Sequence, residues 1–220
     1  MSVLLDNVAA VIVSMIVFAL LASIQHRSIQ QQVAQQSRQT VVERAQELGR
    51  WLREDLERIG DNIEPGENAP YPVAFENPQE SGGTPPLTTE FVFYRDSVQA
   101  NGQKTQVATR YRVQSVGSRE VGGETKTLYQ LRRAQRVGGG TWKSTGASMP
   151  SLLGFQVDLL NRNAVEVSNP ETAAENDLDA VRMVRVRFFL AAPFQNELLS
   201  LQSAHVGTIV VRYPMAEIRS

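Results

Sequence analysis

The stretch that decides the fold is VAAVIVSMIVFALLASI, residues Val8–Ile24, in which seventeen consecutive residues carry no charge. An uncharged apolar run of this kind is typical of a membrane-spanning helix. At about 1.5 Å per residue it covers roughly 25 Å, slightly less than the ~30 Å hydrocarbon core of a bilayer. Extending the span back to Val3 gives about 33 Å, which suffices. The sequence therefore predicts a membrane helix over residues 3–24.

Asp6 is the one charged residue inside this extended span. A carboxylate buried in the apolar layer without a partner costs about 2.5–3.5 kcal/mol on insertion scales. Two interpretations follow: either Asp6 lies at the headgroup level, where its charge costs little, or it is buried to pair with a charge on a neighbouring subunit.

A cleaved signal peptide is the competing interpretation of the apolar run. It needs a basic n-region and a small-residue cleavage site after a short apolar core. No Lys or Arg precedes Arg27, and the helical pattern continues past any suitable cleavage point. We therefore expect the segment to stay in the protein.

The helical pattern continues well beyond the apolar run, because no proline occurs before Pro65. Apolar residues recur at spacings of 3 and 4, which describes one stripe on a helix; they are Ile29, Val33, Val41, Ala45, Leu48, Leu52, Leu56 and Ile59. Charged residues at i,i+3 and i,i+4 spacing form the solvent side; they are Glu47, Arg50, Glu54 and Arg58. A helix from Leu4 to Ile59 is about 84 Å long, so part of it must find partners outside its own domain.

Beyond this helix the chain breaks and then changes period. Six of the ten prolines lie between residues 60 and 89, which predicts a loop. From Thr89 onward apolar and polar residues alternate, and this alternation predicts six strands of an antiparallel sheet. The predicted strands include residues Phe91–Tyr94, Val107–Val113, Leu128–Leu131, Leu153–Leu160, Val184–Leu190 and Val206–Tyr213. Gly138–Gly140 is expected to be a hairpin turn rather than a phosphate-binding loop.

The arginines at alternate strand positions are expected to lie on the solvent face of the sheet. In the strand Val184–Leu190, the side chains of Val184, Val186, Phe188 and Leu190 should then face the core. Val186→Asp is expected to unfold the head, whereas Arg187→Asp is expected to cost no more than about 1 kcal/mol.

Composition argues against several classes of function. The net charge of −1 gives no basic field for nucleic acid, and the absence of cysteine removes disulfides and thiolate metal sites. The only histidines are His26, which lies beside the membrane span, and His205, which precedes a strand where a polar residue is usually at the surface, so we expect neither catalysis nor a cofactor. One weak metal candidate remains, a set of oxygen ligands for Ca²⁺ whose alternative is a solvated acidic loop; its members are Glu175, Asn176, Asp177 and Asp179.

Several motifs, in order along the chain, resemble the type IV pilin-like family. Counting from Ser2, Asp6 occupies the fifth position, where pilins carry a glutamate ahead of an apolar helix. The strand motifs are ATRYRVQSV (108–116), TKTLYQLRRAQRV (125–137), SLLGFQVDLLNRN (151–163), DAVRMVRVRFFLAA (179–192) and VGTIVVRY (206–213). Within the family, the chain is similar to the larger minor pseudopilins, the J component of type II secretion, and to the PilW-type minor pilins. It departs from the family in carrying aspartate rather than glutamate, and Met1-Ser2-Val3 rather than a basic leader ending in glycine.

This resemblance implies an α+β fold, in which a long N-terminal helix with a membrane-inserted first half packs on an antiparallel β-sheet head. The domains are then the membrane or filament-core part of the helix (1–28), its amphipathic part (29–60), a Pro/Gly-rich loop (61–89) and the head (90–220). The implied function is that of a structural subunit of a type IV pilus-like or type II secretion filament, with other pilin-like subunits as partners and Asp6 as the pairing residue. The alternative is a single-pass membrane-anchored binding module that does not polymerise.

The resemblance also implies a location in the bacterial inner membrane, with the head periplasmic or extracellular. The charges flanking the span favour the opposite orientation, because His26 and Arg27 follow it and nothing basic precedes it.

Overall fold

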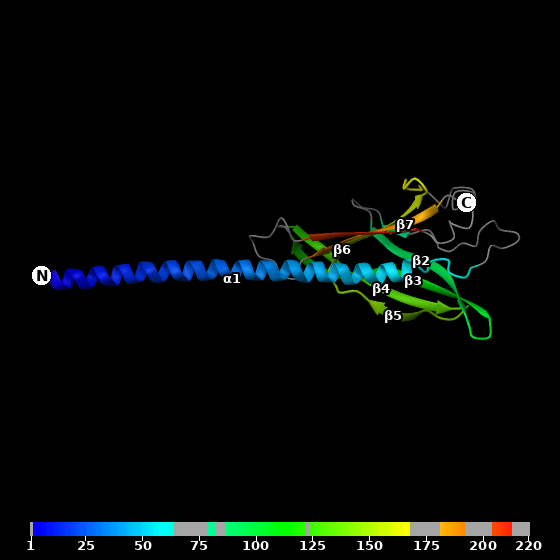
Figure 1. The fold of residues 1–220 in the computed structure, drawn as a ribbon, viewed down its shortest axis with the longest axis horizontal. Coiled ribbons are helices and arrows are strands. Elements are labelled where there is room, and N and C mark those ends of the chain that lie inside the picture. Colours follow the sequence, from blue (N-terminus) through cyan, green and yellow to red (C-terminus); the bar gives the residue numbers. More distant parts are fainter. Residues whose placement is uncertain are drawn as a thin grey trace.

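One long helix and one antiparallel sheet make up the described part of the chain (Figure 1). The computed structural model describes residues 2–63, 79–81, 87–121, 124–167, 181–191 and 204–212. The expected α+β class is confirmed. In Figure 1 the N-terminal half of the helix extends away from the head, and its C-terminal half lies along the sheet.

The helix, α1, runs from Ser2 to Leu56. Its predicted apolar stripe is confirmed from residue 41 onward, because the side chains that face the sheet are almost fully buried; they are Val41, Ala45, Leu48, Leu52 and Leu56, with Ile59 in the following turn. Ile29 and Val33, by contrast, are 59% and 38% exposed, so the stripe meets the head only in its second half. The helix is therefore divided into a part that the head buries and a part that the described residues of the head leave exposed.

The helix ends three residues before the predicted Ile59. Gly60 and Asn62 take positive φ angles of 76° and 58°, which turn the chain out of the helical direction. The amide of Gly60 donates to the carbonyl of Tyr94, and the amide of Asp96 donates to the carbonyl of Asp61, each over 2.8 Å. These two bonds fix the end of the helix to one strand of the sheet.

Over the residues that the structure describes, the sheet contains eight strands, and every pairing between them is antiparallel. The strands are β1 (Gln79–Ser81), β2 (Leu87–Val98), β3 (Lys104–Val121), β4 (Glu124–Val137), β5 (Lys143–Ala147), β6 (Leu152–Asn161), β7 (Val181–Ala191) and β8 (Ala204–Arg212). Their order is β1-β2-β3-β4-β6-β7-β8, with β5 added at β4. The six predicted strands all occur, although Tyr213 lies outside the described residues.

Two strands were not predicted, and one of them overturns part of the expected loop. β1 falls inside the predicted loop 61–89, and β2 begins at Leu87 rather than after Thr89. β1 (QES) and β5 (KSTGA) are short and polar, so they show no alternation of apolar residues. They pair with longer neighbours by backbone hydrogen bonds, which leave no pattern in the sequence.

The register of β7 is as expected. Val184, Val186, Phe188 and Leu190 are all at most 3% exposed and belong to the core. On the adjacent strand β8, Gly207 lies directly opposite Phe188, and a Cβ at this position would collide with the Phe188 ring. Glycine is therefore required here by the close approach of a core aromatic ring.

The expectation that the strand arginines face solvent is wrong for Arg185 and Arg187. Both are partly buried and bind Asp158 of β6, whose side chain is 1% exposed. Arg185 Nε donates to Asp158 Oδ2 over 2.7 Å, and Arg187 donates from Nε and Nη2 over 3.1 Å each. A carboxylate inside the apolar strand LLGFQVDLLN needs compensating cations, and the two arginines on β7 supply them.

Glu80 of β1 lies near this buried carboxylate. Partial burial raises the pKa of Glu80, and the negative charges of Glu166 and Asp158 raise it further.

Arg133 also departs from the expected solvent face, because it lies on the side of the sheet that packs against α1. Its Nε and Nη2 donate to the two carboxylate oxygens of Asp55 over 2.6 and 2.8 Å. The hydroxyl of Tyr111 donates to the same carboxylate. Burial raises the pKa of the Tyr111 phenol well above its ordinary value, and the charge of Asp55 raises it further, so this donor keeps its proton. One carboxylate on the helix thus holds two strands.

Arg187→Asp is expected to lower the free energy of unfolding by about 3 kcal/mol, because it removes one of two cations from a buried carboxylate and adds a like charge. The matched control is Arg162→Asp on an exposed turn, which should change it by no more than about 0.5 kcal/mol. Urea unfolding followed by tryptophan fluorescence measures both. If Arg187→Asp changed the free energy of unfolding as little as the control does, the ion pair between Arg187 and Asp158 would not be needed to stabilise the buried Asp158 carboxylate.

Asp55→Ala is expected to lower the free energy of unfolding by about 3 kcal/mol, because Arg133 and Tyr111 then lose their common acceptor in a buried site. Glu54→Ala removes a carboxylate from the adjacent, exposed position of the same helix and should have little effect. Equal losses from the two variants would contradict the structural role given to Asp55.

Candidate functional site

The first candidate site is the exposed apolar half of α1. Its large side chains project from the helix without covering one another, and Phe18 and Met15 are 74% and 67% exposed. The other members are Val8, Val11, Ile12, Val13, Ile16, Val17, Leu20, Leu21 and Ile24, each about half exposed or more. A continuous apolar surface of this kind is not stable in water and marks a membrane or partner contact. Within the described part of the chain, α1 is the one helix long and apolar enough to cross a membrane.

The predicted pairing residue, Asp6, lies in this half of α1, close to its start. Its backbone is helical, but its side chain lies outside what the structure describes, so its pairing stays a prediction. The calcium candidates Glu175, Asn176, Asp177 and Asp179 also lie outside the described residues. Among the residues that are described, no group of three or more His, Asp or Glu side chains gathers in a way that could hold a metal ion.

The two histidines are not brought together. His26 is hydrogen-bonded over 2.8 Å to Gln30, one turn further along α1, in the part of the helix outside the head. His205 lies on β8, opposite Leu190. The expectation that the protein is not an enzyme remains a prediction.

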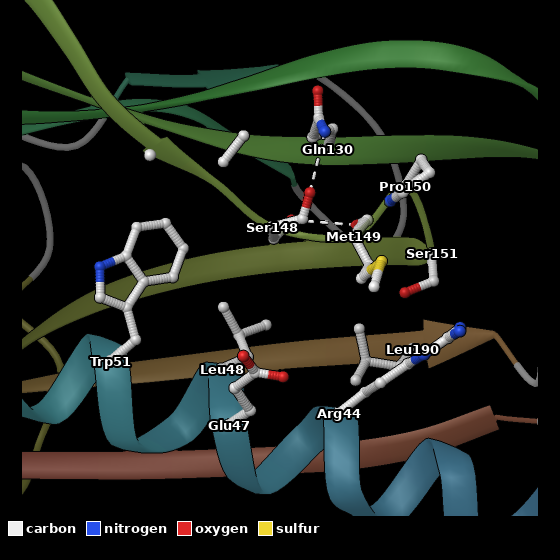
Figure 2. A pocket seen from close by; sticks show the side chains of 12 residues that line it. Arg44, Glu47, Leu48, Trp51, Gln130, Ser148, Met149, Pro150, Ser151 and Leu190 are labelled. Atoms are coloured by element: carbon white, nitrogen blue, oxygen red, sulfur yellow. Dashed lines mark hydrogen bonds between the residues drawn. The ribbon is translucent and has the colours of Figure 1, made fainter.

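The second candidate site is a cavity of about 370 Å³ where α1 meets the head (Figure 2). Its floor is the surface of α1 from Arg44 to Trp51, and its far wall is the end of β5 (Gly146 and Ala147) with the segment 148–151 that connects β5 to β6. The apolar side chains that line it are Leu48, Trp51, Met149, Pro150 and Leu190. Figure 2 shows the Trp51 ring rising from the helix at one end and Met149 reaching down from the opposite wall.

Hydrogen bonds hold the wall of this cavity in place. Ser148 Oγ accepts from the amide of Leu131 over 2.9 Å and donates to the carbonyl of Met149 over 3.0 Å. Gln130 Nε2 donates to the carbonyl of Ser148 over 2.9 Å, as the dashed line in Figure 2 marks. The polar groups of the wall are thus used internally, which leaves the apolar side chains to receive a ligand.

The chemistry of the cavity is that of binding rather than catalysis. Its size falls in the range of small-ligand sites, and its lining is mainly apolar. Arg44 and Glu47, one turn apart on α1, place one charge of each sign beside it. Sequence reasoning did not find this cavity because its walls come from α1, β4, β5, β7 and a connecting segment, which no local pattern links.

No family model, curated protein or solved structure matches this chain. Function is therefore inferred from the two sites.

Deleting residues 1–28 is expected to move the protein from the membrane to the aqueous fraction as a folded head, because the buried stripe begins only at Val41. Fractionation followed by circular dichroism measures the outcome. A full-length chain that is soluble and monomeric without detergent would contradict the assignment of α1 as a membrane anchor.

Proposed function

We propose that this protein is a membrane-anchored structural subunit that assembles with other subunits of the same kind through the N-terminal half of α1. The proposal includes the class suggested by its motifs, a minor pilin or pseudopilin of a type IV pilus-like or type II secretion filament in a bacterial inner membrane. The observation that carries it is one unbroken helix with two environments. The head buries one face of the second half, and the first half exposes a mainly apolar surface over residues 8–24.

The spacing of these two halves supports assembly rather than anchoring alone. Ser37 is the first buried residue among those described along α1, and between Ile24 and Ser37 the helix rises about 20 Å, so the described part of the head is held clear of the bilayer surface. A rigid helical stalk of this length leaves room for the heads of neighbouring subunits to pack at different heights. Anchoring alone would not need it, because an irregular linker would serve.

Helix association explains the role given to Asp6. Lipid chains are as apolar as the exposed face of α1, so leaving the lipid for a bundle of helices gains little from the hydrophobic effect. Close packing and polar pairs must then supply the affinity and the register. A carboxylate near the start of the helix that pairs with a cation of a neighbour would provide such a pair.

A single-pass binding module that does not polymerise is the second candidate, and the cavity beside Trp51 is the observation that favours it. In that case the head would capture an apolar ligand or side chain while α1 serves only as an anchor. The two candidates differ in what α1 contacts, which is other helices in the first case and lipid in the second.

Asp6→Ala is expected to leave membrane insertion intact, because removing a charge lowers the cost of insertion. It should nevertheless reduce, by about tenfold or more, the recovery of partner subunits that co-purify from detergent-solubilised membranes. Those partners, identified by mass spectrometry, should themselves carry an N-terminal apolar helix. Asp6→Glu should be nearly silent, and Asn7→Ala, a polar residue removed at the next position, serves as the control.

Undiminished co-purification of Asp6→Ala would contradict the pairing role and leave Asp6 as a headgroup residue. Photo-crosslinking from Phe18, the most exposed large side chain of the anchor, tests assembly separately. Adducts with lipid alone would contradict assembly and favour the binding module.

A further inference from the structure

An arginine–tryptophan cluster lies on the face of the sheet away from α1. Arg110 of β3 and Arg136 of β4 both place their guanidinium groups over the ring of Trp142, with Cζ 4.3 and 4.8 Å from the ring centroid. In the register of β3 and β4, Arg110 lies opposite Ala134 and Arg136 lies opposite Ala108. Residues directly opposite share a face, so the two arginines lie on this face diagonally across from each other, and two small alanines occupy the other diagonal. The neighbouring positions Tyr111 and Leu131 point the other way, into the core with α1.

The charges of this cluster are not neutralised within the described part of the protein. There, no carboxylate pairs with Arg110, Arg136 or the adjacent Arg132. Arg112, on the same face, differs because Glu90 binds its Nη2 over 2.6 Å. The Nε of Arg136 is moreover buried with no hydrogen-bond acceptor.

A buried donor on a charged group is costly when its hydrogen bond is unmade. The indole ring attracts the cations through its π-face, but it offers their N–H groups no lone pair. Buried polar groups in native proteins nearly always have a partner. The two arginines of the cluster thus keep donors that have no acceptor among the described residues, and a binding site for an anion needs such donors.

We propose that the cluster of Arg110, Arg136 and Trp142 binds a carboxylate-bearing segment of a partner protein. A guanidinium presents two parallel donors that match the two oxygens of a carboxylate. The contact with the Trp142 ring restricts both arginine side chains before the ligand arrives, which lowers the entropy lost on binding. Arginine and tryptophan are also the residues most often found at the energetic centres of protein interfaces.

The position of the cluster argues against an anionic membrane surface. Tyr94, which accepts from the amide of Gly60, lies in the same row as Ala108 and Arg136, so the cluster lies level with the end of α1. From Ile24 to Leu56 the helix rises about 48 Å. That distance is several times the screening length of roughly 8 Å at physiological salt, so lipid charges have no influence there.

The extent of the cluster argues against nucleic acid. On the same face of β2, Glu90 and Asp96 lie at the two sides of the cluster, opposite Arg112 and Gln106. The whole chain carries a net charge of −1. A nucleic-acid site needs an extended basic stripe that follows many phosphates. A small cationic surface between two acids fits one or two carboxylates instead.

This inference concerns the head alone and goes beyond the assembly function proposed for α1. It is tested with the full chain in neutral detergent and a short oligoglutamate peptide. Because the chain has two tryptophans, Trp51→Phe leaves Trp142 as the single fluorescent reporter. Oligoglutamate should change its emission saturably, and an oligoglutamine peptide of equal length should not.

Arg110→Gln and Arg136→Gln should each weaken oligoglutamate binding by about tenfold or more. Arg162→Gln removes the same charge from an exposed turn elsewhere on the head and should change binding less than about twofold. Arg136→Lys keeps the charge but loses the planar pair of donors, so most of the affinity should still be lost. It also provides the test if the glutamine variants fail to fold, which thermal unfolding checks.

The proposal is overturned if no peptide binds, or if Arg162→Gln weakens binding as much as Arg136→Gln. Full affinity in a folded Arg136→Lys variant would overturn the paired-donor geometry. Tighter binding of single-stranded oligothymidylate than of oligoglutamate would also overturn the proposal of a carboxylate ligand, and would identify the cluster as a nucleic-acid site.

Discussion

The burial of one stripe of α1 against the sheet is the interaction on which the rest of the structure depends. The stripe begins at Val41 and ends with Leu56, and all of these side chains belong to the buried core. Each fully buried leucine contributes about 2 kcal/mol, so the docked half of the helix is held firmly. The other half receives no such contribution from the part of the chain that the structure describes. It has to be stabilised by lipid or by other helices, and this need is the physical basis of the proposed function.

Buried charges then determine how the apolar surfaces are aligned. Asp55 joins the last turn of α1 to β3 and β4, and Asp158 joins β6 to β7. Apolar packing alone tolerates small rotations of a helix on a sheet, whereas a bidentate ion pair does not. The head can therefore present its outer surface, including the cluster around Trp142, at a defined angle to the anchor.

The helix, its buried stripe and six of the strands could be predicted from the sequence, because each has a hydrophobic period that repeats over several residues. β1 and β5 could not, since they are held by backbone pairing and have polar side chains. The ion pair of Asp55 and Arg133 joins residues 78 positions apart, and no local pattern marks it. Asp158 did leave a signal, a single acid within an apolar strand, which should have predicted a cationic partner.

The candidate sites divide in the same way. The apolar half of α1 is a local pattern and was found from the sequence, whereas the cavity beside Trp51 and the arginine–tryptophan cluster arise only when separate strands come together. The side chain of Asp6 and the acidic residues around Asp177 are known from the sequence alone.

Cysteine accessibility along α1 tests the central claim most directly. The chain contains no cysteine, so single-cysteine variants report one position each. In native membranes, a membrane-impermeant maleimide should leave Phe18 and Leu52 positions unlabelled and should label the Gln32 position between them. Full denaturation should allow labelling of all three positions, which shows that each cysteine is reactive. Uniform labelling from the Phe18 position to the Gln32 position in intact membranes would contradict a helix divided between two environments.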